Sequence, residues 1–248
     1  MREQGIVASV GSIEKNCIHN KSCMALGVLL GNPATSLQCL LLDWNEFDDK
    51  GMEELTGGLM NNDTLKVLSL KYPHCLGCTT SIGWQTFAPY LSNPRCSMET
   101  LDLSGNEKIG DDGISSIGKA MGVNTTLKWL DLYGSKSVTS VGWHAFSTGL
   151  KISAIEELQL YQCSIGDESA FAIVSALAEN PSFTSLHMNS SKTISSAGWV
   201  WCFQWLLDLK KTSLKTLSLP WIDKEGIAML NKLHAKYLSK KNAMVLEY

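Results

Sequence analysis

Paired leucines recur along this chain at a nearly constant spacing. In each case two leucines, or similar apolar residues, are separated by one residue and follow another apolar residue three places upstream. Seven such segments begin at Leu37, Leu65, Met98, Leu127, Ile155, Phe183 and Leu214. A weaker copy fits upstream, with Ala8, Gly11 and Ile13 in the same frame. The pattern covers nearly the whole chain and indicates an internal repeat of about 28 residues or slightly more.

Each repeat predicts a short strand followed by a helix. The alternating leucines are typical of a strand that buries one face. After each strand comes a residue with a short polar side chain, a type that caps helix N-termini. We expect these caps at Asn20, Asp49, Ser81, Asp111, Ser140, Asp167 and Ser196. Apolar residues then follow at helical spacing, as Ile114, Ile117 and Met121 do after Asp111.

A glycine–tryptophan pair recurs in every second repeat, as TSIGWQTF at 80–87, TSVGWHAF at 139–146 and SSAGWVWCF at 195–203. Trp84, Trp143 and Trp199 fall in the same column as Ile114 and Ala170 of the intervening repeats. A large residue that alternates with smaller ones fills space between stacked units. We therefore expect the three tryptophans inside the core and not in a ligand cage.

The best-preserved repeats resemble the leucine-rich repeat family in its ribonuclease-inhibitor-like subtype. They read LQCLLLDWNEF at 37–47, METLDLSGN at 98–106 and IEELQLYQCSI at 155–165. The resemblance implies an α/β right-handed solenoid, or horseshoe, with a parallel sheet on the concave face and helices on the convex face. We expect one domain over 1–248, with a degenerate first repeat at 1–36, seven repeats at 37–241 and a C-terminal capping strand at 242–248.

The residues beside the paired leucines are predicted to project from the concave face. Near the middle of the array they include three aromatic residues in an acidic surround, a composition typical of protein-binding hot spots. The candidate partner-binding residues are Trp129, Tyr133, Tyr161, Asp102, Asp131, Glu157, Asp43, Trp44 and His187. They favour a protein partner that presents lysine or arginine among apolar side chains. Alternatively, these aromatic residues stabilise the sheet through cross-strand contacts and have no ligand.

Composition and motifs give no indication of an enzyme or of a metal, cofactor, nucleic-acid or membrane site. The five histidines fall in different repeats, and no nucleophile–base set or phosphate-binding loop appears, so we expect no catalytic residue, no metal and no cofactor. The chain has two arginines and a net charge of −3, which argue against nucleic acid as a partner. No long apolar run indicates a membrane segment, and eight cysteines without a secretory signal indicate a cytoplasmic protein.

The sequence therefore predicts a monomeric, non-catalytic scaffold for protein–protein interaction. The resemblance also implies two alternatives: a regulator of an enzyme, like a ribonuclease inhibitor or a GTPase-activating protein, and a fragment of a larger leucine-rich-repeat sensor. Two further features stay open. The CLGC motif at 75–78 has no second close pair for zinc, and Trp201 and Trp205 share one flank of a helix, where they either pack on a neighbour or form an outer contact.

Overall fold

A computed structural model describes residues 9–16, 18–71, 79–188, 193–209, 212–218, 224–238 and 245–247, and within them strands and helices alternate strictly. The strands are β1 Ser9–Ser12, β2 Leu37–Leu41, β3 Val67–Ser69, β4 Thr100–Asp102, β5 Trp129–Asp131, β6 Glu157–Gln159, β7 Ser185–His187, β8 Thr216–Ser218 and β9 Val245–Glu247. The helices are α1 Asn20–Leu30, α2 Asp49–Leu59, α3 Ser81–Leu91, α4 Gly110–Met121, α5 Ser140–Leu150, α6 Asp167–Glu179, α7 Ser196–Asp208 and α8 Lys224–Leu238.

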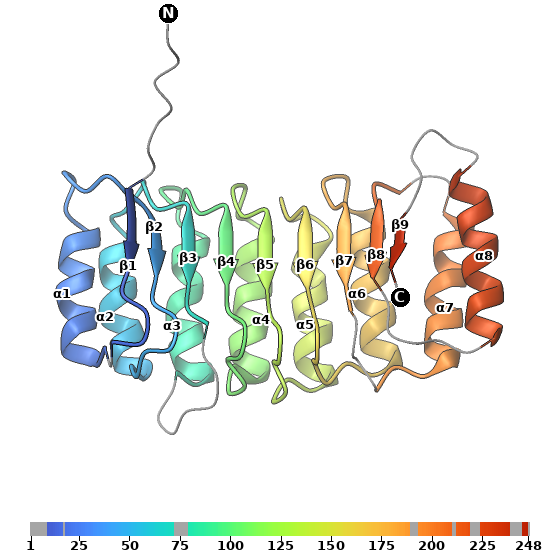
Figure 1. Cartoon of the computed structure of the whole chain (residues 1–248), viewed down its shortest axis with the longest axis horizontal. Coiled ribbons are helices and arrows are strands. Elements are labelled where there is room, and N and C mark those ends of the chain that lie inside the picture. The colour runs from blue at the N-terminus through green and yellow to red at the C-terminus, as the bar shows by residue number, and fades with distance from the viewer. Residues whose placement is uncertain are drawn as a thin grey trace, which may run out of the picture.

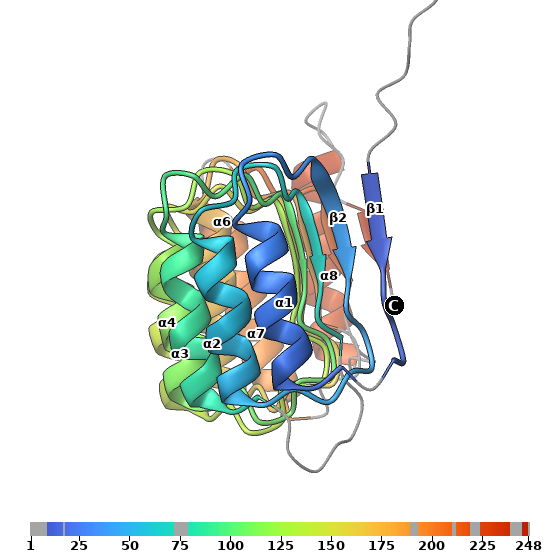
Figure 2. The same cartoon turned by 90° about the vertical axis from the view of Figure 1, so that its left-hand side faces the viewer.

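The described strands form one parallel sheet in the order of the sequence, β1 to β9, and the helices form a second layer behind it (Figure 1). Equivalent leucines stand side by side across neighbouring strands, as Leu101, Leu130 and Leu158 do. Helices are wider than strands, so stacking bends the array toward the sheet. Figure 2 shows this bend, because α3 and α4 lie farther from the sheet side than α1 and α8. The predicted α/β solenoid is confirmed.

The core lies between the two layers and contains the residues that the repeat predicts. Leu130 and Leu132 of the fifth unit are fully buried, and so are Trp143 and the equivalent Trp84 and Trp199 to within 1%. The inward placement of the tryptophans is therefore confirmed. Each indole packs edge-on or stacked against a phenylalanine of its own helix, with ring centroids 5.8–5.9 Å apart.

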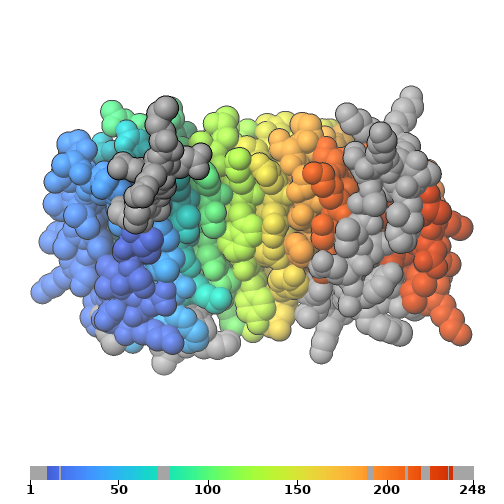
Figure 3. Space-filling view, turned by 45° about the horizontal axis from the view of Figure 1, so that its top comes forward, coloured from blue at the N-terminus to red at the C-terminus, as the bar shows by residue number. Residues whose placement is uncertain are grey.

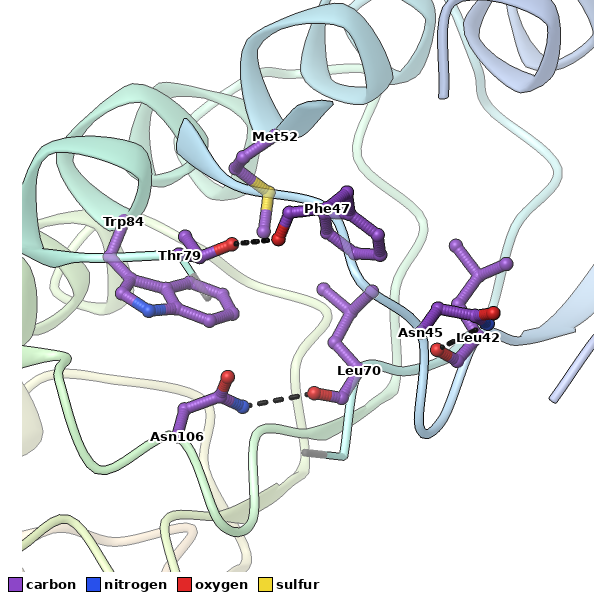
Figure 4. A pocket seen from close by; sticks show the side chains of 8 residues that line it. All are labelled: Leu42, Asn45, Phe47, Met52, Leu70, Thr79, Trp84 and Asn106. Atoms are coloured by element: carbon purple, nitrogen blue, oxygen red, sulfur yellow. Dashed lines mark hydrogen bonds between the residues drawn. The ribbon is translucent and has the colours of Figure 1, made fainter. Parts of the chain in front are cut away.

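Buried amides satisfy the backbone where β2 and β4 turn toward their helices. Asn45 Nδ2 donates to the carbonyls of Ile13 and Leu42, and its Oδ1 accepts from the backbone N–H of Ile18. Asn106 Nδ2 likewise donates to the carbonyls of Leu70 and Leu103. Figure 4 shows both residues beside a small cavity of about 10 Å³ that Trp84 and Met52 also line. These bonds pair backbone groups that the turning chain would otherwise bury without a partner.

The expected helix caps are wrong by one position, and by two positions at Asp111. Asn20, Asp49, Ser81, Ser140, Asp167 and Ser196 are the first residues of their helices, and Asp111 is the second residue of α4. Where a side chain does cap a helix, the residue before the helix provides it, and these caps are Asp48, Thr80, Thr139 and Ser195. The repeat pattern placed residues of the right type near each helix start, but it does not define the first helical residue to better than one or two positions.

Three of the displaced aspartates instead bind the cap of the next repeat. Asp49 accepts from the backbone N–H and the hydroxyl of Thr80, at 2.6 and 2.7 Å. Asp111 makes the same pair of bonds to Thr139, and Asp167 makes it to Ser195. A Cβ atom on Gly83 would lie 2.6 Å from Asp49 Oδ1, so the carboxylate requires glycine there. Gly142 and Gly198 lie equally close to Asp111 and Asp167, so each of these aspartates sits against the glycine of the next repeat.

Two further points of the sequence analysis concern the CLGC motif and membrane-spanning segments. The CLGC motif lies outside the described residues. Among the residues that are described, no helix combines the length and the apolar character that a membrane span requires.

Candidate functional site

Most of the predicted partner-binding residues lie on or just after four neighbouring strands, β4 to β7, in the central repeats. Figure 3 shows these repeats in green to orange. Strand register sets Asp102 beside Asp131 and Trp129 beside Glu157. One strand further, Gln159 stands beside His187. The neighbours of the buried leucines alternate to the outer side of the sheet, so these side chains share one face. We call this group, with Tyr133 and Tyr161 just beyond the strands, the concave patch.

The Glu157 carboxylate links three repeats of the concave patch. Its Oε1 accepts from Trp129 Nε1 at 3.1 Å and from Gln159 Nε2 at 2.6 Å. His187 Nε2 lies 3.7 Å from the same oxygen. These contacts hold the Trp129 indole in one orientation on the sheet, where the ring remains half-exposed.

The two tyrosines flank this centre from the ends of their strands. The Tyr133 hydroxyl donates to Gln162 Oε1 at 2.9 Å, and the tyrosine keeps 37% of its surface exposed. The Tyr161 ring lies 6.0 Å from the His187 ring, centroid to centroid. Gln162 was not among the predicted residues. Its side chain comes from the turn after β6, where a positive φ of 52° directs the chain, and the repeat pattern carries no signal for that.

Asp131 lies where burial disfavours the charged form of its carboxyl group. Its Oδ1 accepts from the Tyr133 backbone N–H at 2.7 Å. Burial nevertheless raises the pKa of Asp131 to about 6, and the neighbouring charge of Asp102 adds to the rise while Lys71 opposes it. Among the described residues, no lysine or arginine forms an ion pair with Asp102 or Asp131. Within that part of the chain, the negative charge of Asp102 and Asp131 therefore has no direct ion-pair partner.

Asp43 and Trp44 lie at the end of β2, two strands away from Asp102. Asp43 Oδ1 accepts from the Ser69 hydroxyl at 2.5 Å and from the Lys71 backbone N–H at 3.0 Å. Burial raises the pKa of Asp43, and the negative charge of Asp102 adds to the rise. Because Asp43 and Asp102 influence each other through charge, Asp43 extends the acidic surface. Trp44 has a φ of 62° and its ring faces Lys15 Nζ at 5.3 Å. The structure does not bring Trp44 together with the aromatic residues of the concave patch.

The Asp131 pKa predicts how folding stability depends on pH. Because the folded state binds this proton more tightly than the unfolded state, protonation stabilises the fold. Stability should rise by about 1 kcal/mol between pH 7 and pH 5, as Asp131 is protonated below its folded pKa, and the rise should continue toward the unfolded pKa near 4. Urea titrations at both pH values measure it.

The variant Asp131→Asn provides the control for that measurement. Asparagine retains the acceptor for the Tyr133 N–H but has no proton to bind in this range. We expect the variant to lose this contribution to the pH dependence and to be more stable than the wild type at pH 7. An unchanged pH profile in the variant would show that Asp131 titrates as an ordinary surface carboxyl.

Histidine, cysteine and acidic residues are the groups that metal binding or thiol chemistry would use. Within the described part of the chain, no three histidine, cysteine or acidic residues gather in a way that would hold a metal ion. Burial raises the pKa of the Cys23, Cys163 and Cys202 thiols to about 12. Such thiols remain protonated at neutral pH and are poor nucleophiles.

Comparisons with known proteins agree with this architecture. The sequence profile of a family described as leucine-rich repeat matches residues 34–55 and 96–118. A comparison with curated proteins finds no significant match. Among 73 solved chains that match is the actin-binding site 2 of leiomodin-1, at 17% identity and a TM-score of 0.52. The match covers 62% of this chain and 88% of that one. The profile thus matches parts of two repeats, and the described residues have the fold of a leucine-rich-repeat solenoid.

Proposed function

We propose that the chain is a non-catalytic scaffold whose concave patch binds a protein partner through lysine or arginine set among apolar side chains. The observation that carries the proposal is the pair of Asp102 and Asp131, which are adjacent on the sheet, partly buried and without an ion-pair partner among the described residues. A carboxylate that destabilises its own fold gains most when a cationic partner covers it. Natural proteins retain such costs mainly where a function needs them.

The aromatic residues beside this pair support the same use. The Glu157 carboxylate fixes Trp129 and the Gln162 amide fixes Tyr133, so neither side chain has to be ordered when a partner arrives. Aromatic side chains that are already ordered bind at a lower entropic cost. Trp and Tyr are also the residues most enriched among those that dominate binding energy.

The comparisons support protein binding in general terms. The name of the leiomodin-1 segment records that it binds actin, which is a protein partner of another chain with this fold. At 17% identity that likeness concerns the fold alone, so we take no partner from it. Repeats of 28 and 29 residues, with helices of 11 residues or more, further support the ribonuclease-inhibitor-like subtype.

The test compares proteins captured from a native lysate by the wild type and by the double variant Trp129→Ala, Tyr133→Ala. We expect the double variant to lose the partner, because removing two ordered aromatic side chains typically costs about 2 kcal/mol or more of binding energy. Capture by the wild type should also weaken as the salt concentration rises, since the acidic pair attracts its partner through charge.

The charge variant and its control separate the acidic pair from general surface charge. Asp131→Asn removes one negative charge from the concave patch, and Glu53→Gln removes one from the exposed side of α2. We expect the first to weaken capture and the second to leave it unchanged. If all variants retain the same proteins as the wild type, the concave patch is not the binding surface.

A further inference from the structure

The helix α7 has an apolar surface in the helix layer. From Ser196 to Leu207 this helix contains no charged residue, although one side of it faces solvent. Trp201 is 58% exposed there. Its ring contacts Phe171 of α6 at 5.7 Å, and Trp205 contacts the same phenylalanine at 5.9 Å. Packing on α6 thus accounts for part of the Trp201 surface and leaves more than half of it open.

A pocket of about 440 Å³ opens beside this tryptophan, on the face formed by the helices α6, α7 and α8. Its walls are apolar along α7 and acidic at both sides. The residues that line it are Asp167, Ala197, Gly198, Val200, Trp201 and Glu225. The two carboxylates come from the first turns of α6 and α8, on either side of α7. The pocket therefore combines an exposed indole with two negative charges.

These charges are not neutralised by the part of the protein that the structure describes. None of its lysine or arginine side chains forms an ion pair with Asp167 or Glu225. Asp167 accepts two hydrogen bonds from Ser195, which fix the position of its carboxylate. The negative charge of this carboxylate faces the positive N-terminal end of α7. Neutral donors leave the carboxylate charge in place, so the described side chains that line the pocket favour a cation over an anion.

We propose that this pocket receives an arginine side chain of a protein partner. A planar guanidinium can stack on the exposed face of Trp201 and donate hydrogen bonds to a carboxylate at its edge. Lysine has no planar group for this stacking, so the combination of a flat indole and flanking carboxylates favours arginine. The pocket is lined by residues of α6, α7 and α8, whereas the concave patch lies on the sheet, so the two surfaces can be occupied independently. Figure 1 shows the sheet and the helices as separate layers.

The test uses the full chain and a capped tripeptide, N-acetyl-Ala-Arg-Ala-amide, as the probe. The ¹H–¹⁵N signal of the Trp201 indole, assigned by its loss in Trp201→Phe, reports binding. The control peptide carries citrulline, which has the shape of arginine but no charge. We expect a saturable shift of the Trp201 signal with the arginine peptide at millimolar concentrations. No shift, or an equal shift with the citrulline peptide, would overturn the proposal.

Matched variants identify the carboxylate. Glu225→Gln should weaken binding of the arginine peptide about threefold, as expected for loss of one partly exposed charge contact. Glu168→Gln removes the same charge from an exposed position of α6 that does not line the pocket, and should change nothing. Equal effects of both variants would contradict a defined site. Asp131→Asn should leave the Trp201 shift intact, which separates this site from the concave patch.

Discussion

Replacing Trp143 by alanine should lower the free energy of unfolding by about 3–5 kcal/mol. The indole is fully buried between the sheet and its helix, and it lies edge-on to Phe146 at 5.9 Å. Alanine would leave a large cavity between stacked repeats, which the rigid sheet cannot close. Urea titrations followed by circular dichroism measure the change.

Trp143→Phe is the control for this substitution. Phenylalanine keeps most of the ring contacts and removes an indole N–H that has no hydrogen-bond partner among the described residues. Its cost should therefore be clearly smaller than that of alanine. Equal stability of wild type and Trp143→Ala would mean that the tryptophan column does not support the core.

Replacing Gly58 by alanine should destabilise the protein by about 3 kcal/mol. The helices α1 and α2 approach most closely at Gly27 and Gly58. A Cβ atom on Gly58 would overlap the carbonyl oxygen of Gly27, which is backbone and cannot move out of the way. The two helices would have to separate, and the contacts of both repeats would weaken.

The adjacent Gly57 is a matched control within the same helix. A Cβ atom there meets nothing within 4 Å, and the residue is exposed. Gly57→Ala should therefore stabilise the protein by about 0.5–1 kcal/mol, because alanine loses less backbone entropy in a helix. Thermal and urea unfolding of the two variants should move in opposite directions. Destabilisation of similar size in both would show that helix propensity, and not close approach, governs this contact.

Much of the fold follows directly from the sequence. The paired leucines recur with a constant frame, and their burial on one side of each strand requires a neighbour on both sides. The tryptophan column was predicted for the same reason, since its position in the repeat equals that of Ile114 and Ala170. These features depend on periodicity within one repeat, which a single sequence shows plainly.

The contacts between repeats were less predictable. Asp49 and Thr80 are 31 residues apart, and their hydrogen bonds depend on how one helix start sits against the next. The sequence shows two residue types that each suit a helix cap, and it does not show that the aspartate of one repeat binds the cap of another. The same limit applies to Glu157, whose link to Trp129 and His187 needs the strand register.

The sequence by itself determined the repeat, the strand–helix order of each unit, the buried leucines and tryptophans, and the set of side chains that share the sheet face. The tertiary structure decided which of those side chains meet, how far Asp131 is buried, and that Trp201 borders a pocket with acids from α6 and α8. The physical reason is the distance along the chain between the residues that determine each feature. Periodic burial is encoded by near neighbours along the chain, whereas hydrogen bonds, pKa values and pockets depend on ångström-scale positions that stacking alone sets.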